Sequence, residues 1–230
     1  MIVGEIVAWL TDPASWQGED GIWMQVLRHL AYSFAALALA CLVAVPLGLW
    51  IGHTGKGSVV AVNLAGALRA LPSLGLLLLG WVLLAPHLPG DAAFVLPSLI
   101  VLAVLAIPPV LSGVYSGIAE VDPAARDAAK GMGMTGMQVL RRVEIPVALP
   151  LILSGVRSGL LQIIATATIA AYVSLGGLGR YLIDGLAARD YTQMAGGALL
   201  VAGLALLMEL VFTLVQKLVV SPGLADQEAR

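Results

Sequence analysis

The segment Glu120–Pro150, EVDPAARDAAKGMGMTGMQVLRRVEIPVALP, is the longest polar interruption in an otherwise apolar chain. It holds four of the twelve basic residues, namely Arg126, Lys130, Arg141 and Arg142. Charged side chains are costly inside a lipid bilayer, so they are expected to lie in water. We predict that this segment is a loop on one side of a membrane.

Two short helices are predicted within this loop. Asp122 followed by Pro123 is typical of an N-cap with proline at the first helical position. Small apolar side chains then recur along one helical face, opposite a charged face: Ala124, Ala125, Ala128, Ala129 and Met132 against Arg126, Asp127 and Lys130. Gly133 is expected to end or bend this helix. Thr135 and Gln138 have the spacing of a capping box, which predicts the start of a second short helix.

The composition of the chain indicates an integral helical membrane protein. Of its 230 residues, 60% are hydrophobic and 11% are charged, far from the values of soluble globular domains. The net charge of −2 gives no basic face for nucleic acid. The single cysteine, Cys41, has no partner for an internal disulfide, and His29, His53 and His87 lack the spacing of metal ligands. Motifs of ATP hydrolysis and of common hydrolases are missing, so we expect no enzyme and no cofactor in this chain.

Apolar runs predict five membrane spans, each long enough to cross the hydrocarbon layer. They cover about residues 27–51, 58–84, 93–118, 146–172 and 194–220. Pro72 in the second span is expected to kink its helix, as are Pro108 and Pro109 in the third. The predicted transmembrane domain is therefore 27–220.

The two ends of the chain differ from the spans. Residues 1–26 are acidic and contain Trp9, Trp16 and Trp23, which predicts either a segment in the lipid headgroup layer or a partly disordered tail. Residues 1–10 lack the basic region of a cleavable signal peptide. Residues 221–230 form a charged tail.

The distribution of lysine and arginine predicts the orientation. With five spans, one side holds Lys56, Arg126, Lys130, Arg141, Arg142, Lys217 and Arg230, and the other holds Arg28, Arg180 and Arg189. The positive-inside rule places the former side in the cytoplasm. We therefore expect the loop and the C-terminus inside and the N-terminus outside.

Arg69 and Arg157 fall within predicted spans. Each lies about eleven residues from the cytoplasmic end of its span, or roughly 16 Å at 1.5 Å per residue. Such arginines are expected to face the bundle interior or an aqueous cavity. They either line a translocation path or have a structural role, and Glu209 is a candidate partner.

Small residues suggest close helix packing. The pairs Gly48/Gly52, Gly113/Gly117 and Gly155/Gly159 have GxxxG spacing, with enough small surface for a dimer. Thr166 and Thr168 lie on a small-residue face that suits a pore, unless their hydroxyls bond back to their own helix. Gly176, Gly177 and Gly179 are expected to allow a sharp outer turn or irregular backbone along a pore.

The loop resembles the cytoplasmic EAA loop of binding-protein-dependent ABC transporter permeases. That motif is Glu-Ala-Ala, three residues, Gly, nine residues, then Ile-x-Leu-Pro. This chain keeps every spacing, with Asp for Glu, Val for Ile and Ile for Leu. The resemblance implies that the loop, residues 120–146, couples to an ATPase through Asp127, Ala128, Ala129, Gly131, Gly133, Thr135, Val143, Ile145 and Pro146.

Further stretches resemble the osmoprotectant branch, the glycine betaine/carnitine/choline permeases. They are Leu71–Leu74, Glu120–Pro123, Gly131–Thr135, Ala165–Ala170 and Gly176–Gly179. The methionine permease type is a relative with a similar five-span core, so methionine or another small solute is the alternative. An ion-coupled secondary transporter would need inverted repeats and acidic midplane residues, and a purely structural subunit would not explain the loop motif.

The family implies inward transport by alternating access in a bacterial inner membrane. The implied partners are two copies of a cytosolic ABC ATPase that holds ATP and magnesium, an extracytoplasmic substrate-binding protein, and a second permease chain, identical or paralogous. The binding protein is expected at the turns near residues 86–91 and 176–193.

Overall fold

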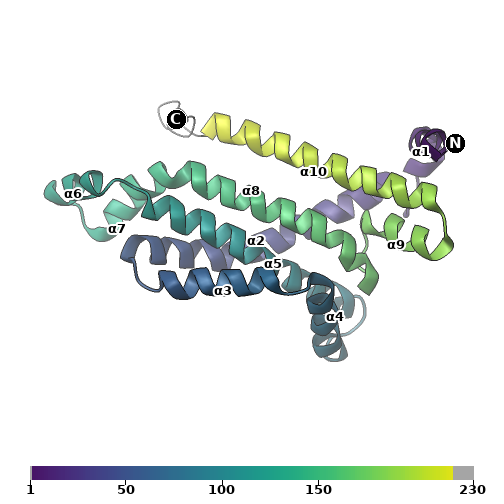
Figure 1. The fold of residues 1–230 in the computed structure, drawn as a ribbon, viewed down its shortest axis with the longest axis horizontal. Helices are drawn as coiled ribbons and strands as arrows, with labels where there is room; N and C mark the ends of the chain where they lie inside the picture. Colours follow the sequence, from purple (N-terminus) through teal and green to yellow (C-terminus); the bar gives the residue numbers. More distant parts are fainter. Residues whose placement is uncertain (1, 220–230) are drawn as a thin grey trace. The chain divides into compact units, whose positions relative to one another are not determined.

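The computed structural model describes residues 2–219 as helices joined by short turns (Figure 1). Their bounds are α1 Ile2–Thr11, η1 Pro13–Trp16, α2 Ile22–Thr54, α3 Ser58–Ala70, α4 Ser73–Leu84, η2 Ala85–His87, α5 Ala92–Ala119, α6 Pro123–Gly131, α7 Gly136–Val139, the π-helical turn η3 Leu140–Glu144, α8 Ile145–Ala170, η4 Ala171–Val173, α9 Gly179–Ala188 and α10 Tyr191–Val219. No strand occurs within this range. The predicted tail 221–230 lies outside the described residues.

Within residues 2–219, four stretches are long and apolar enough to cross a membrane. They are Ile22–Thr54, Ala92–Ala119, Gly136–Val173 and Tyr191–Val219. The pair α3 and α4 adds a fifth span if it is counted as one broken span. The all-helical fold class predicted from composition is thus confirmed.

The predicted second span is broken at a proline, whereas the third span continues through its prolines. Helix α3 ends at Ala70, and Pro72 is an extended N-cap (ψ 115°) of α4, so the expected kink is a complete break. Proline has no N–H, which is tolerated where helical N–H groups lack partners anyway. In contrast, α5 continues through Pro108 and Pro109.

The second loop helix is continuous with the fourth span. Helix α7 passes through η3 directly into α8. Pro146 cannot donate the α-helical hydrogen bond to the carbonyl of Arg142, and the wider π-helical turn lies at this point. The span therefore begins before the expected residue 146.

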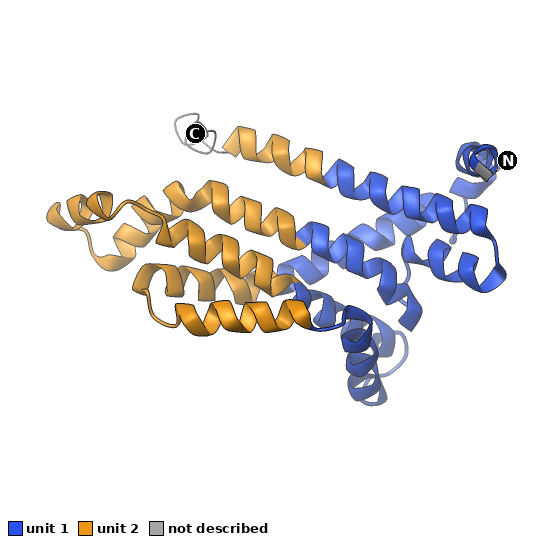
Figure 2. Ribbon diagram, viewed as in Figure 1, with its two compact units in different colours: residues 1–39, 71–105, 160–208 blue, residues 40–70, 106–159, 209–230 orange. Residues whose placement is uncertain are grey.

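The chain divides into two compact units (Figure 2). Unit 1 comprises residues 1–39, 71–105 and 160–208, and unit 2 comprises residues 40–70, 106–159 and 209–230. Helices α2, α5, α8 and α10 contribute residues to both.

Unit 1 has its core where α2, α9 and α10 contribute Ile22, Tyr181 and Leu204. The N-terminal segment packs on this core: the rings of Trp9 and Tyr181 meet edge to face with centroids 5.2 Å apart. Trp16 Nε1 donates to the Leu10 carbonyl at 2.8 Å. Helix α2 begins at Ile22, earlier than the predicted residue 27, and Ile22 itself is fully buried in this core.

Unit 2 is built on close helix contacts at glycine. A Cβ on Gly113 would lie 2.6 Å from Gly155 Cα, so α5 and α8 meet backbone to backbone. Gly48 and Gly52 of α2 instead pack closely on the side chains of Val114 and Ile118 of α5. The prediction of tight packing is confirmed, but these glycines serve contacts within the chain rather than a surface left for a dimer.

Candidate functional site

The predicted loop contains both predicted helix starts. Asp122 Oδ1 accepts a hydrogen bond from Ala124 N at 2.8 Å and caps α6. In the capping box of α7, Gln138 Oε1 accepts from Thr135 N at 2.8 Å, and Thr135 Oγ1 accepts from Gln138 N at 3.4 Å. Local hydrogen bonds that are readable from the sequence therefore fix where both helices begin.

A glycine makes the turn between the two helices. Gly133 has φ +86°, in the left-handed region, and its N–H donates to the Lys130 carbonyl at 2.9 Å. Met134 N donates to the Ala129 carbonyl at 3.2 Å and completes the cap of α6. Nothing lies within 4 Å of a Cβ built on Gly133. Backbone conformation, rather than space, is what requires glycine here.

The small-residue face of α6 is largely open. Ala124, Ala125, Ala128 and Met132 are exposed, whereas Ala129 is buried. On the opposite face, Asp127 and Lys130 are exposed, with Oδ1 and Nζ 4.0 Å apart. Of the remaining candidate residues, Gly131, Thr135 and Pro146 are exposed, and Val143 and Ile145 are half-buried.

Arg126 departs from the predicted charged face. Its side chain is only 20% exposed, because it turns inward to the carboxylate of Glu144 and the carbonyl of Ile118. The expectation that every charge of the loop lies in water was therefore wrong for Arg126, and also for Glu144. A buried counter-ion is what allows the guanidinium to leave water.

Glu144 is the centre of a buried polar cluster, which we call the Glu144 cluster: it forms an ion pair with Arg126 and a hydrogen bond with His53. The Glu144 side chain is 1% exposed; Oε1 lies 2.9 Å from Arg126 Nε, and Oε2 lies 2.6 Å from His53 Nδ1. The three residues come from η3, α6 and the last turn of α2. The cluster thus joins the loop to the ends of two membrane helices.

One feature of the amino-acid sequence points to this cluster. Glu144 is an acid between Val143 and Ile145, at the point where the chain turns apolar. An ionisable residue at such a point needs a specific partner. Neither His53 nor Arg126 is near it in sequence, so the partners could not be identified without the fold.

Arg157 has the partner that the sequence suggested. Its Nε donates to Glu209 Oε2 at 2.6 Å, and Nη2 also pairs with Oε1. Both side chains are about one-third exposed. This ion pair neutralises the arginine between α8 and α10, which favours the structural role over direct contact with a solute.

Replacing Arg157 with Met is expected to lower the melting temperature of the purified protein by roughly 3–6 °C, since it leaves Glu209 without a counter-ion. The double variant Arg157→Met/Glu209→Met should recover most of this loss. Thermal unfolding in detergent measures both. An equal or larger loss in the double variant would contradict the assigned pairing.

The hydroxyls of Thr166 and Thr168 are engaged within α8. Thr166 Oγ1 donates to the Gln162 carbonyl at 2.8 Å, and Thr168 Oγ1 donates to the Ala165 carbonyl at 2.6 Å. These bonds follow the common pattern of threonine in a membrane helix. They leave the predicted pore-lining role of both residues without support from geometry.

The turn at Gly176–Gly179 packs tightly against neighbouring backbone. Gly177 has φ +99°, and its N–H donates to Gln25 Oε1 of α2 at 2.7 Å. A Cβ on Gly179 would lie 2.3 Å from the Thr168 carbonyl oxygen. The structure shows a turn held by α2 and α8, and a place of this turn along a pore stays a prediction.

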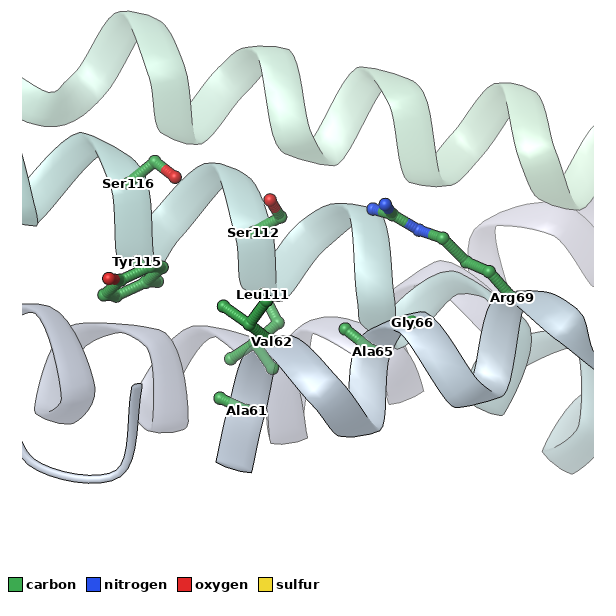
Figure 3. Close-up of a pocket in the computed structure, with 9 residues that line it drawn as sticks. All are labelled: Ala61, Val62, Ala65, Gly66, Arg69, Leu111, Ser112, Tyr115 and Ser116. Carbon is green, nitrogen blue, oxygen red and sulfur yellow. The ribbon is translucent and has the colours of Figure 1, made fainter. Parts of the chain in front are cut away.

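Arg69 lies at the end of α3 and lines two neighbouring cavities of unit 2, one of which is drawn in Figure 3. Its side chain is exposed, in contrast to the paired Arg157.

Residues 44–221 match the family described as binding-protein-dependent transport system inner membrane component. The match covers more than half of the 230-residue chain. The chain belongs to this family. As an inner membrane component with several apolar helices, it is a multi-pass membrane protein.

Curated relatives resemble this permease over most of their length. It is 33% identical over 197 residues to the glycine betaine/carnitine/choline transport system permease protein OpuCB of Bacillus subtilis, which covers 86% of this chain and 88% of that protein. It is 31% identical over 197 residues to the choline transport system permease protein OpuBB of the same organism, with the same coverage. It is 30% identical over 182 residues to the osmoprotectant import permease protein OsmW of Salmonella typhimurium, covering 79% and 84%. All are permease subunits, so this chain is a transport subunit and not an enzyme.

Solved structures confirm the predicted fold of an ABC importer permease. A chain of the inward-facing MetNI methionine ABC transporter has a TM-score of 0.72 at 21% identity, covering 89% of this permease and all of that chain. A chain of an amino acid ABC transporter crystallised with histidines has a TM-score of 0.63 at 24% identity, covering 86% and 91%. At these identities the likeness concerns the fold alone. Families of this kind work with an ATPase and a substrate-binding protein.

Proposed function

We propose that this permease carries a quaternary ammonium osmoprotectant, namely glycine betaine, choline or carnitine, into the cell by alternating access. The observation that carries the proposal is the set of curated relatives at 30–33% identity, which are named for these solutes and match about four-fifths or more of the chain. Permeases of this class are powered by a separate ATPase subunit, where ATP and magnesium would bind.

The proposed assembly contains two permease chains, identical or paralogous, two copies of the ATPase and one extracytoplasmic binding protein. The excess of lysine and arginine on one side favours a cytoplasmic loop and C-terminus and an external N-terminus. In this orientation the binding protein would meet the turns near residues 86–91 and 176–193, and the ATPase would meet α6.

Two features of the loop support a role in transmitting movement of the ATPase to the membrane helices. The exposed small face at Ala124, Ala125 and Ala128 fits a groove that admits no long side chains. The Glu144 cluster ties α6 to α2 and to the start of α8. A force on α6 would therefore reach two membrane helices without being absorbed by a flexible connection.

Gly133→Val is expected to lower ATP-driven uptake about tenfold or more while the protein remains folded, because a β-branched residue disfavours the left-handed conformation of the turn by about 1–2 kcal/mol. Gly133→Asn is the matched control, since asparagine tolerates that conformation. Uptake in proteoliposomes, with size-exclusion profiles for folding, measures both. Equal uptake in the two variants would argue against a requirement for this turn.

The experiment that tests the function is uptake of labelled glycine betaine into proteoliposomes that hold this chain, its ATPase and its binding protein. Unlabelled choline, carnitine and methionine serve as competitors. We expect ATP-dependent uptake that choline or carnitine inhibits and methionine does not. Transport of methionine instead would keep the importer and replace the solute, and transport without any ATPase would favour the ion-coupled alternative.

A further inference from the structure

We propose that a serine-lined cavity in unit 2 binds the carboxylate of a zwitterionic solute through Arg69; this proposal deepens the proposed function and rests on it for the identity of the solute. The cavity has a volume of about 410 Å³ and lies among α3, α5 and α8. Its polar lining consists of Arg69, Ser112, Ser116, Glu120, Ser154 and Ser158.

The four serines form two rows of hydroxyls. Ser112 and Ser116 are one turn apart on α5, as are Ser154 and Ser158 on α8. The close contact of Gly113 with Gly155 brings the two helices together beside these rows. Other hydroxyls bond back to a carbonyl of their own helix, namely those of Ser98, Thr166 and Thr168. Within residues 2–219, none of the four serines that line the cavity forms such a bond. Their hydroxyls are therefore free to bind a solute.

Arg69 provides a positive charge at this cavity. Figure 3 shows its guanidinium extended from α3 toward Ser112 of α5. No carboxylate of the described chain lies within 4.0 Å of it, whereas Arg157 is paired with Glu209. A guanidinium in a membrane segment favours an anionic partner, and a carboxylate fits its planar fork.

The charge pattern of the cavity selects a class of ligand. Glu120 lines the same cavity and repels a free anion, but it would attract the ammonium end of a zwitterion. The serine hydroxyls that line the cavity can hydrogen-bond a carboxylate. Glycine betaine and carnitine carry both groups, and choline carries only the ammonium. We therefore assign Arg69 as a residue that distinguishes solutes with a carboxylate from solutes without one.

The first test compares uptake of labelled glycine betaine and choline by Arg69→Gln and Arg69→Lys in the reconstituted importer. Arg69→Gln is expected to lower the ratio of betaine to choline uptake about tenfold, since one charge-assisted contact of roughly 1.5 kcal/mol is lost. Arg69→Lys should keep most of the ratio, because it retains the charge. An unchanged ratio of betaine to choline uptake in Arg69→Gln would overturn the proposal, whether uptake of both solutes stays the same or falls equally.

The second test does not depend on the solute that is carried. In a Cys41→Ala background, Ser112→Cys is treated with an anionic sulfonate or a cationic trimethylammonium methanethiosulfonate reagent. The measured quantity is the ratio of the reaction rates of the anionic and the cationic reagent. With Arg69 present, this ratio should be several-fold higher at Ser112→Cys than at Met137→Cys, an exposed loop position. Arg69→Gln should remove this preference at Ser112→Cys and leave it unchanged at Met137→Cys.

The two tests separate the possible failures. If the wild-type importer moves none of the three solutes, the proposed function is wrong, and the reagent rates still decide whether Arg69 makes the cavity attract anions. If the wild type moves betaine but the reagent preference is independent of Arg69, the cavity assignment is wrong and the function stands.

Discussion

Glu144→Ala is expected to abolish most ATP-driven uptake, with a loss of more than tenfold. Removing the carboxylate leaves the guanidinium of Arg126 in a largely buried position without a counter-ion. Breaking a buried pair in this way costs about 3 kcal/mol, the lower end of the usual range, because Arg126 and His53 are about one-fifth and one-quarter exposed. Helix α6 would then lose its connection to α2 and α8. Trypsin should cleave the loop after Lys130 or Arg141 faster than in the wild type.

The controls for this prediction separate the cluster from general effects of charge. Glu19→Ala removes an exposed carboxylate and should change neither uptake nor cleavage. Arg126→Ala and the double variant Glu144→Ala/Arg126→Ala complete a thermodynamic cycle, and the double variant should be less impaired than the sum of the single variants. Additive losses, or wild-type uptake in Glu144→Ala, would show that the Glu144 cluster does not connect α6 to α2 and α8.

Gly179→Ala is expected to prevent correct folding of unit 1, with a destabilisation of about 3 kcal/mol or more. The added Cβ would lie 2.3 Å from the carbonyl oxygen and 2.7 Å from the Cα of Thr168. Both are backbone atoms, so no side chain can rotate away, and α8 or the turn itself must shift. The yield of monodisperse protein in detergent and its melting temperature measure the loss.

Gly203→Ala is the matched control for Gly179→Ala. Gly203 lies inside α10, and nothing is within 4 Å of a Cβ built on it. Alanine has a higher helix propensity than glycine, so this variant should be neutral or slightly stabilised. A similar loss of yield in both variants would mean that packing at Gly179 is not the cause.

The sequence alone determined features that depend on local chemistry. Apolar run length predicted the membrane helices, because every backbone polar group in a bilayer must be satisfied within a helix. Asp122, Thr135 and Gln138 predicted both helix starts in the loop, because a cap is formed with residues at most three positions away. Gly133 predicted the turn for the same local reason.

Contacts between distant segments were decided by the tertiary structure. Thr166 and Thr168 sit on a face that reads equally well as a pore or as packing, and only the fold shows their hydroxyls bonded within α8. Pro72 lies at a break between two helices, whereas α5 continues through Pro108 and Pro109. All three residues are prolines, so the residue type alone does not predict this difference.

The Glu144 cluster shows the physical reason most clearly. His53 and Glu144 are 91 residues apart in the chain, and nothing in either neighbourhood specifies the other. Local propensity, capping and hydropathy act over a few residues, and they suffice to predict helices and turns. An ion pair or a shared cavity requires the helices to be packed first, so the Glu144 cluster and the serine-lined cavity exist only in the folded chain.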